Sequence, residues 1–161
     1  MSKLLGSEMP DDLFALMSGK AVEAGKVFIM ATVDENGWCH PAMGSYYELV
    51  AKSPGRIHLA VGKNSTTERN LVRTGALTLV VTDHGLNYYL KGNATRTRER
   101  LDDTPFALFQ VELHTVLEDQ EQGVTIVTGV RYELNQGGNS EFMRQMLDKA
   151  LHALTAAPWE T

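Results

Sequence analysis

The polar residues that could do chemistry gather most densely between Lys63 and Asn70, directly after an apolar run. Ser65, Thr66 and Thr67 are residue types that cap helices, so a helix is expected to begin among them. Unpaired amide groups and the helix dipole at such a start both attract phosphate, and Lys63 stands just before it. These residues predict an anion site, although runs of this kind also cap ordinary surface helices with no further role.

The other residues with chemical potential indicate neither a catalytic nor a metal site. The histidines show no metal-ligand spacing with one another, with a cysteine or with a carboxylate; they are His40, His58, His84, His114 and His152. His40 and His58 lie in expected strands that could be neighbours. Histidines paired in this way are more often hydrogen-bonded to backbone or water than catalytic. The single cysteine, Cys39, excludes an internal disulfide and is interpreted as a small packed hydrophobe. No catalytic residue is assigned, and no metal is expected.

Short apolar segments between turn signals are expected to position these residues. Strands are expected over residues 26–33, 38–50, 57–61, 76–82, 87–98, 106–117 and 124–134. The pair Asn36-Gly37 is a strong hairpin signal between the first two. Helices are expected over about 10–18 and 140–156, with a third inserted after the Ser65 cap. Six or seven strands with hairpin connections favour a mainly β fold, an antiparallel barrel with short N-terminal, inserted and C-terminal helices.

Length and composition favour one ordinary globular domain. The 161 residues are 43% hydrophobic and 22% charged, so a single domain over 1–161 with a core at about 26–134 is expected. The formal net charge of −5 argues against a basic field for nucleic acid. No apolar run approaches the length of a membrane span, and residues 1–25 lack the apolar core of a leader. We therefore expect a cytoplasmic protein with no nucleic-acid or membrane partner.

Several segments, taken together in order, resemble those of a known family. They are Phe28–Val33, the turn Asp34–Gly37 with its return strand, Asn64–Leu71, Leu77–Val81 and Leu90–Ala94. In this order and spacing the chain resembles the pyridoxamine 5′-phosphate oxidase-like, FMN-binding split-barrel family. The resemblance covers about Val27 to Leu134.

The resemblance implies a six-stranded antiparallel split β-barrel of Greek-key type that forms a homodimer, with FMN in a cleft between the subunits. Family members hold the phosphate at the junction of strand and helix, which corresponds here to Ser65, Thr66 and Thr67 together with Lys63. The flavin ring would lie along segments that match Ala42, Met43, Gly44, Ala60 and Val61. Asn87 occupies a position at which the oxidases use a polar contact to the ring.

The chain also departs from the oxidase pattern. In the true oxidases two basic residues follow the serine, whereas Thr66 and Thr67 stand there in this chain. Lys63 or Arg69 could replace the missing charges. The substrate-binding C-terminal segment of the oxidases has its nearest match in Gly129–Tyr132, which is weak. Oxidation of pyridoxamine phosphate is therefore not the expected activity.

The sequence thus predicts a small FMN-binding protein, an oxidoreductase or flavin reductase-like enzyme acting on a small-molecule substrate or electron donor that the residues do not identify. One alternative is a non-catalytic haem- or flavin-binding sensor or storage module on the same fold, with His40, His58 or His84 as haem ligand. Others are a deazaflavin-dependent reductase and a cofactor-free structural dimer.

Overall fold

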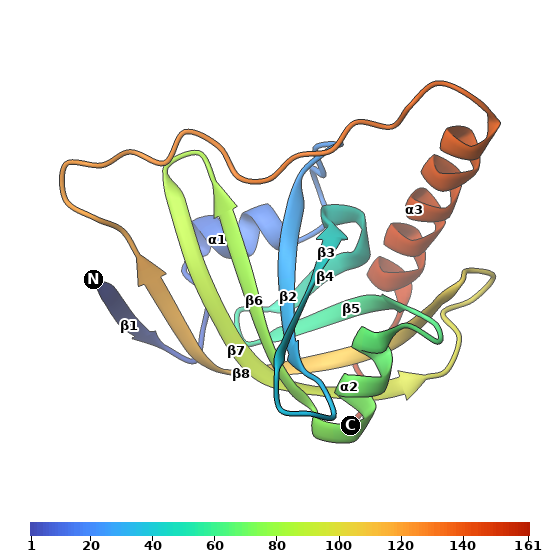
Figure 1. The fold of residues 1–161 in the computed structure, drawn as a ribbon, viewed down its shortest axis with the longest axis horizontal. Helices are drawn as coiled ribbons and strands as arrows, with labels where there is room; N and C mark the ends of the chain where they lie inside the picture. The colour runs from blue at the N-terminus through green and yellow to red at the C-terminus, as the bar shows by residue number, and fades with distance from the viewer.

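An open antiparallel sheet of eight strands forms the frame of the protein, which a computed structural model describes over residues 1–161 (Figure 1). The strands are β1 (Ser2–Gly6), β2 (Val27–Val33), β3 (Cys39–Ser45), β4 (Leu49–Ser53), β5 (Arg56–Gly62), β6 (Ala76–Asp83), β7 (Leu86–Arg98) and β8 (Phe106–Asp119). The helices are α1 (Asp11–Met17), α2 (Thr66–Thr74) and α3 (Gly138–Ala156), with a short 3-10 helix η1 (Tyr46–Glu48). The sheet order is β3-β2-β6-β7-β8-β5-β4, and β1 pairs with β8. No helix is both long enough and apolar enough to cross a membrane.

The mainly β class is confirmed, but the expected number of six strands is wrong, and the sheet is not closed into a complete barrel. The segment expected as one strand over 38–50 is split into β3 and β4, because η1 interrupts it with its own capping box. The segment 124–134, expected as a strand, forms only an isolated bridge between Arg131 and Lys26. The preceding strand, β8, has no free side near its end, because Glu118 already pairs with Tyr88 of β7 and with Lys3 of β1.

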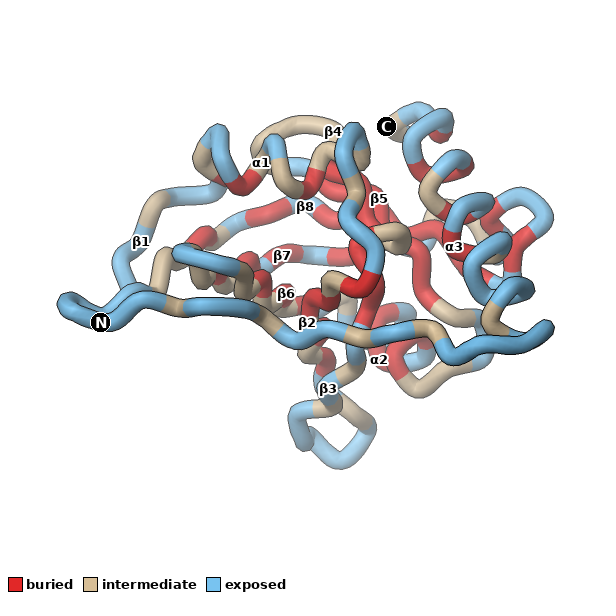
Figure 2. The backbone as a smooth tube through the Cα atoms, turned by 90° about the horizontal axis from the view of Figure 1, so that it is seen from above, coloured by how far each residue is buried: buried red, intermediate tan, exposed pale blue.

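The core consists of two apolar clusters separated by β5 and β8. Side chains alternate between the two faces of a strand, so Leu59 of β5 points into the barrel while Ala60 points out of it. Leu59 belongs to a cluster of 23 buried residues that includes Phe28 and Phe109. Ala60 belongs to a smaller cluster that packs against α3, including Leu154. Figure 2 shows the buried stretches of the central strands beneath more exposed connections.

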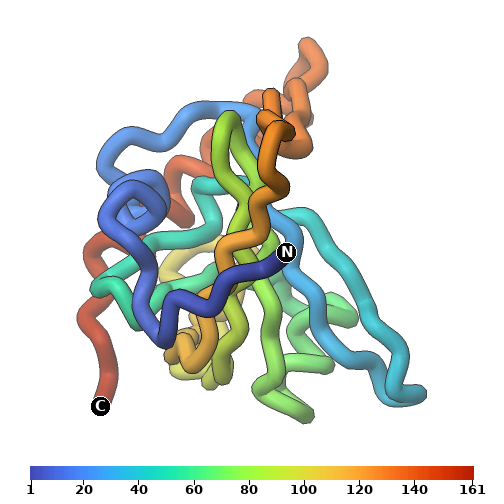
Figure 3. Tube along the Cα trace, turned by 90° about the vertical axis from the view of Figure 1, so that its left-hand side faces the viewer, coloured from blue at the N-terminus to red at the C-terminus, as the bar shows by residue number.

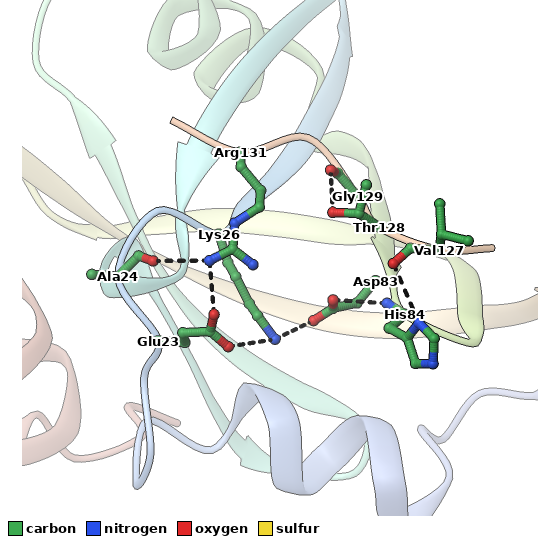
Figure 4. Close-up of polar contacts among 9 residues, drawn as sticks. All are labelled: Glu23, Ala24, Lys26, Asp83, His84, Val127, Thr128, Gly129 and Arg131. Atoms are coloured by element: carbon green, nitrogen blue, oxygen red, sulfur yellow. Dashed lines mark hydrogen bonds and ion pairs between the residues drawn. The ribbon is translucent and has the colours of Figure 1, made fainter. Parts of the chain in front are cut away.

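Residues 120–137, here named the strap, cross the open end of the barrel between β8 and α3 (Figures 1 and 3). The Tyr132 N–H donates to Gly25 O at 2.9 Å, and the Gly85 N–H donates to Ile126 O at 2.8 Å. Figure 4 shows the charged contacts, in which Lys26 binds Asp83 and Glu23 while Arg131 binds Glu23 at 2.7 Å. Strand β2, the β6–β7 hairpin and the strap are therefore tied together.

Candidate functional site

The start of α2 has the capping geometry that the sequence predicted. Ser65 is the N-cap, and its Oγ accepts the Glu68 N–H at 3.1 Å. Asn64 adopts a left-handed backbone with φ of 62°, and its N–H donates to Glu68 Oε2 at 2.6 Å. Glu68 in turn pairs with Arg96 at 3.1 Å. The hydroxyl of Ser65 is thus used for capping, while the helix offers no acceptor to the amides of Thr66 and Thr67.

Positive charge is concentrated around this start of α2. Arg69 folds back along the helix, donating to Asn64 O at 2.8 Å and to Thr66 Oγ1 at 3.0 Å. Lys63 is exposed, and its side chain has no hydrogen-bond or ion-pair partner. A cation beside the positive end of a helix dipole is unfavourable, and an anion bound there would relieve this repulsion. Arg69 therefore lies against the Thr66 hydroxyl, whereas the Lys63 side chain is free of protein partners.

Two polar hollows flank this region, and both are lined by Arg69 and Arg73. One of about 350 Å³ is also lined by Asn64, Glu68, Val72 and Arg96. The other, of about 430 Å³, is also lined by Asp34, Glu35, Asn36, Thr66 and Asn70. The Asp34 carboxylate within it already accepts two backbone N–H groups of the β2–β3 turn. Arg69 and Arg73 thus lie between the two hollows, each of which also contains at least one carboxylate.

A larger, mostly apolar cavity of about 500 Å³ lies between the end of β3, the strap and α3. It is lined by Val27, Met43, Gly44, Ser45, Glu48, Phe106, Val130, Arg131, Tyr132, Leu134, Met143 and Leu147. Met43 and Gly44 are two of the residues expected to contact a flavin ring. A Cβ on Gly44 would lie 2.4 Å from Phe28 Cζ, so the space directly above this glycine is filled by the protein's own ring. The open volume lies beside Gly44 and not over it.

The apolar cavity and the start of α2 are connected through the pairing of β5 with β8. Phe106, which lines the cavity, is the register partner of Gly62. The next residue, Lys63, donates its N–H to Pro105 O at 3.0 Å. The positively charged junction therefore begins one residue beyond the strand pair that borders the cavity. The cavity shares no lining residue with either hollow, so the backbone pairing of β5 with β8 is what relates the two regions.

Other residues expected at the site are not brought there by a single chain. Ala60 and Val61 are each 1% exposed and belong to the two core clusters, Thr67 is buried, and Ala42 packs against the barrel core. Asn87 lies at the β6–β7 hairpin, where it bonds with Thr82, Tyr89 and the Asp119 backbone. Arg96 lies nine positions after Asn87 along β7, a path of roughly 30 Å along an extended strand. Asn87 therefore lies apart from the start of α2 in this chain.

Glu48 is the residue of this region that sequence reasoning missed. Its Oε2 accepts the Ser45 N–H at 2.6 Å, and the Ser45 hydroxyl lies 3.1 Å from that of Tyr132. Burial raises the pKa of Glu48 to about 7, opposed in part by the Ser45 hydrogen bond. The pattern of a glutamate three residues after a serine signals a capping box and could have drawn attention to it. Its place in a cavity depends on the strap and α3, which no local pattern reveals.

The buried histidine is held by the C-terminal part of the chain. Nδ1 of His58 lies 3.3 Å from Leu154 O, and Nε2 lies 3.3 Å from the amide of Gln110. The ring stacks on Trp159 with centroids 5.3 Å apart. Burial lowers the pKa of His58. Because both nitrogens face protein groups, the geometry supports a packing role for this residue.

Comparison with known proteins identifies the family and the fold. No family model matches the chain. The uncharacterized protein YclD of Bacillus subtilis (strain 168) is 32% identical over 131 residues, which make up 79% of this chain and 84% of YclD. The structure of a candidate pyridoxamine 5′-phosphate oxidase from Lactobacillus delbrueckii superposes with a TM-score of 0.57 at 16% identity, over 72% of this chain and 98% of that one. An FMN-binding protein from Syntrophomonas wolfei gives 0.52 at 17% identity, over 66% and 83%. The chain therefore belongs to the family of Bacillus subtilis YclD and has the split-barrel fold of the pyridoxamine 5′-phosphate oxidase-like, FMN-binding proteins.

Proposed function

We propose that this chain is a small homodimeric flavoprotein that binds FMN and acts as an oxidoreductase of the flavin-reductase type. The observation that carries the proposal is the apolar cavity beside a helix start that gathers Lys63 and Arg69. Such a pairing of an apolar volume with an anion site matches a ligand that has a flat ring at one end and a phosphate at the other. The fold of the Syntrophomonas wolfei FMN-binding protein supports the same conclusion.

The phosphate would be held by the amides of Thr66 and Thr67, by the Thr66 hydroxyl and by the two nearby cations. Arg69 already donates to Thr66 Oγ1, so a small rotation of its guanidinium would turn it toward a bound anion. Ser65 would act mainly through the cap that orients these amides. Charge-assisted bonds of this kind contribute roughly 1.5–3 kcal/mol each.

The ring would be placed by the apolar side chains of the cavity, with Met43 and Phe106 at the end nearer the phosphate. Covering this volume excludes water, which strengthens the polar contacts that remain inside. The bound flavin would supply the redox chemistry, while the protein sets its position and its electrostatic surroundings. The substrate and the electron donor are not specified by these residues.

A second subunit would complete the site. Met43 is 69% exposed and Trp38, just before β3, is 73% exposed, so an apolar surface lies along this edge strand of the sheet. Asn87, which one chain holds away from α2, would reach a flavin only from a partner. Dilution below the dimer dissociation constant should then release the flavin. Retention of flavin by a demonstrated monomer would contradict the interface placement.

The first test is the visible absorption spectrum of freshly purified protein, followed by an FMN titration. Flavin absorbance or stoichiometric uptake is expected, and bleaching by NAD(P)H would support the reductase. A Soret band would instead support the haem-binding module, and uptake of a deazaflavin in preference to FMN would support the deazaflavin-dependent reductase. A colourless protein that takes up none of them would favour the structural dimer.

The matched mutational test replaces single arginines. Arg69→Ala should weaken FMN binding by roughly 10- to 100-fold, in line with the loss of a charge-assisted contact. Arg100→Ala is the control, because Arg100 is an exposed arginine that pairs with Asp103 and lines neither the two hollows nor the apolar cavity. Equal affinity of the two variants would remove the start of α2 from the binding site.

A further inference from the structure

The apolar cavity contains one carboxyl group that the local backbone uses only in part. Glu48 Oε2 accepts the Ser45 N–H at 2.6 Å, which completes the capping box of η1. Glu48 Oε1 has no hydrogen-bond partner in the protein, and the side chain lines the cavity. Capping therefore explains one oxygen of this carboxyl group and leaves the other available to a ligand.

No cation compensates this carboxyl group. Arg131, the other charged residue that lines the cavity, is held by Glu23 at 2.7 Å and by Ala24 O at 3.5 Å. The hydroxyl of Tyr132, also from the strap, is bonded to Ser45.

The charged groups of α3 do not shift the pKa of Glu48. Arg144 pairs with Glu141 at 2.6 Å. Burial and the Ser45 hydrogen bond are the causes of the shifted pKa of Glu48, with no contribution from a charged group. The segments β2, β3 and β8 contribute only Val27, Met43, Gly44, Ser45 and Phe106 to the cavity wall, none of which is charged. An ionised Glu48 would thus be a lone charge beside apolar groups, and closing the cavity over it would disfavour ionisation further.

We propose that Glu48 presents a carboxylic O–H to the ring system bound in the cavity, so that flavin binding takes up a proton. Because Oε2 accepts a backbone N–H, the proton resides on Oε1, which is the oxygen left free. A carboxylic O–H recognises hydrogen-bond acceptors, such as the carbonyl oxygens and unprotonated ring nitrogens of a flat heterocycle. Flavins belong to this class, and the inference rests on the proposed function.

The proton has a definite origin and destination. Above neutral pH the free protein holds Glu48 mostly as the carboxylate, because burial raises its pKa to about 7 and not beyond. Binding of the ring takes one proton from solvent onto Oε1 and removes water from the cavity. Affinity should therefore be constant well below pH 7 and fall tenfold for each pH unit well above it.

Riboflavin is the appropriate probe, because the second pKa of a phosphate group, about 6, would add its own pH dependence to FMN. Its dissociation constant is measured by fluorescence from pH 5.5 to 8.5. For the unmodified protein we expect it to rise by about 30-fold between pH 6 and 8.5. Calorimetry in two buffers of different ionisation enthalpy should show close to one proton taken up per riboflavin at pH 8.5.

Two variants make the test specific. Glu48→Gln keeps an oxygen for the Ser45 N–H and offers an amide N–H to the ligand, so its affinity should be independent of pH and its proton uptake zero. Glu112→Gln, which removes an exposed carboxylate that pairs with Arg56 on the sheet, should behave as the unmodified protein. A pH-independent affinity in the unmodified protein, or proton uptake that persists in Glu48→Gln, would overturn the assignment of Glu48 alone. Failure of the unmodified protein to bind either riboflavin or FMN at any pH would overturn the proposed function and this inference with it.

Discussion

Two glutamates of this chain stand three residues after a capping serine, and their surroundings differ completely. In Ser65–Glu68 the carboxylate lies between the Asn64 N–H and the Arg96 guanidinium, so its charge is compensated on both sides. In Ser45–Glu48 the carboxyl group receives one N–H and otherwise faces apolar side chains. The same local motif therefore places one carboxyl group in an ion pair at the start of α2 and leaves one oxygen of the other without a protein partner in the cavity. A neighbouring cation makes the difference.

The largest effect should come from the pH dependence of stability at Glu48. Its folded pKa of about 7 lies above the ordinary value of 4.5, so between these values the folded state binds more protons than the unfolded state. Stability from this group is therefore full below about pH 4.5 and is lost as pH rises toward 7. The loss should amount to roughly 3 kcal/mol at most. Urea unfolding at pH 5 and 8 should show that Glu48→Gln lacks this fall, whereas Glu112→Gln retains it.

The next effect concerns the cap at the start of α2. Ser65→Ala combined with Thr66→Ala should weaken FMN binding by about one to two orders of magnitude, because the Thr66 hydroxyl contact is lost together with the cap that orients the amides of Thr66 and Thr67. The loss of the Ser65 cap should also lower the free energy of unfolding by about 1 kcal/mol. Titration and denaturation of the same sample separate the two effects. Unchanged FMN affinity would mean that the α2 motif serves capping alone.

Two glycines allow the packing of the two regions to be compared directly. A Cβ at Gly44 would meet Phe28 Cζ at 2.4 Å, whereas a Cβ at Gly62 would meet its first neighbour, Ser65 Cβ, only at 4.0 Å. Gly44→Ala should therefore destabilise the protein by roughly 1–3 kcal/mol through overpacking. Gly62→Ala should change stability by less than about 0.5 kcal/mol. Equal unfolding midpoints of the two variants would show that Phe28 can shift without a loss of stability, and that the cavity wall can therefore rearrange.

The smallest expected effect tests the attachment of the strap to the cavity. Tyr132→Phe removes the hydroxyl that lies 3.1 Å from Ser45 Oγ and should lower the free energy of unfolding by about 1 kcal/mol. A double-mutant cycle with Ser45→Ala isolates this contact from the capping role of Ser45. A coupling energy near zero would mean that the backbone bond of Tyr132 to Gly25 holds the strap without help.

The features that the sequence predicts well are those built from neighbours along the chain. The β2–β3 hairpin, with Val33 opposite Cys39, and the Ser65 cap both depend on residues only a few positions apart. The pairing of β1 with β8 joins residues more than a hundred positions apart, so no local pattern indicates it. The segment 124–134 has a strand-like sequence, but β8, which precedes it, is already paired with β7 and β1 near its end, and only the assembled sheet reveals this.

The same distinction between local and long-range contacts applies to the candidate site. The cluster of Lys63, Ser65 and Thr66 is readable because one turn of helix brings it together. The cavity requires the end of β3, the strap, Phe106 and α3 to meet, and the raised pKa of Glu48 follows from that meeting alone. The Arg69 side chain points back toward Thr66 because it donates to Thr66 Oγ1, and the sequence does not indicate this contact.

The pairing of β1 with β8 also bears on the order in which the chain folds. Ser2 lies opposite Asp119, so this strand closes a loop that spans most of the chain before it gains any hydrogen bond. Four of its five residues are exposed, which leaves little burial to offset that loss of freedom. We expect β1 to dock only after the β6–β7–β8 sheet has formed. In the native protein its amide protons should exchange with solvent far faster than those of β7, with Leu90 as a slowly exchanging reference.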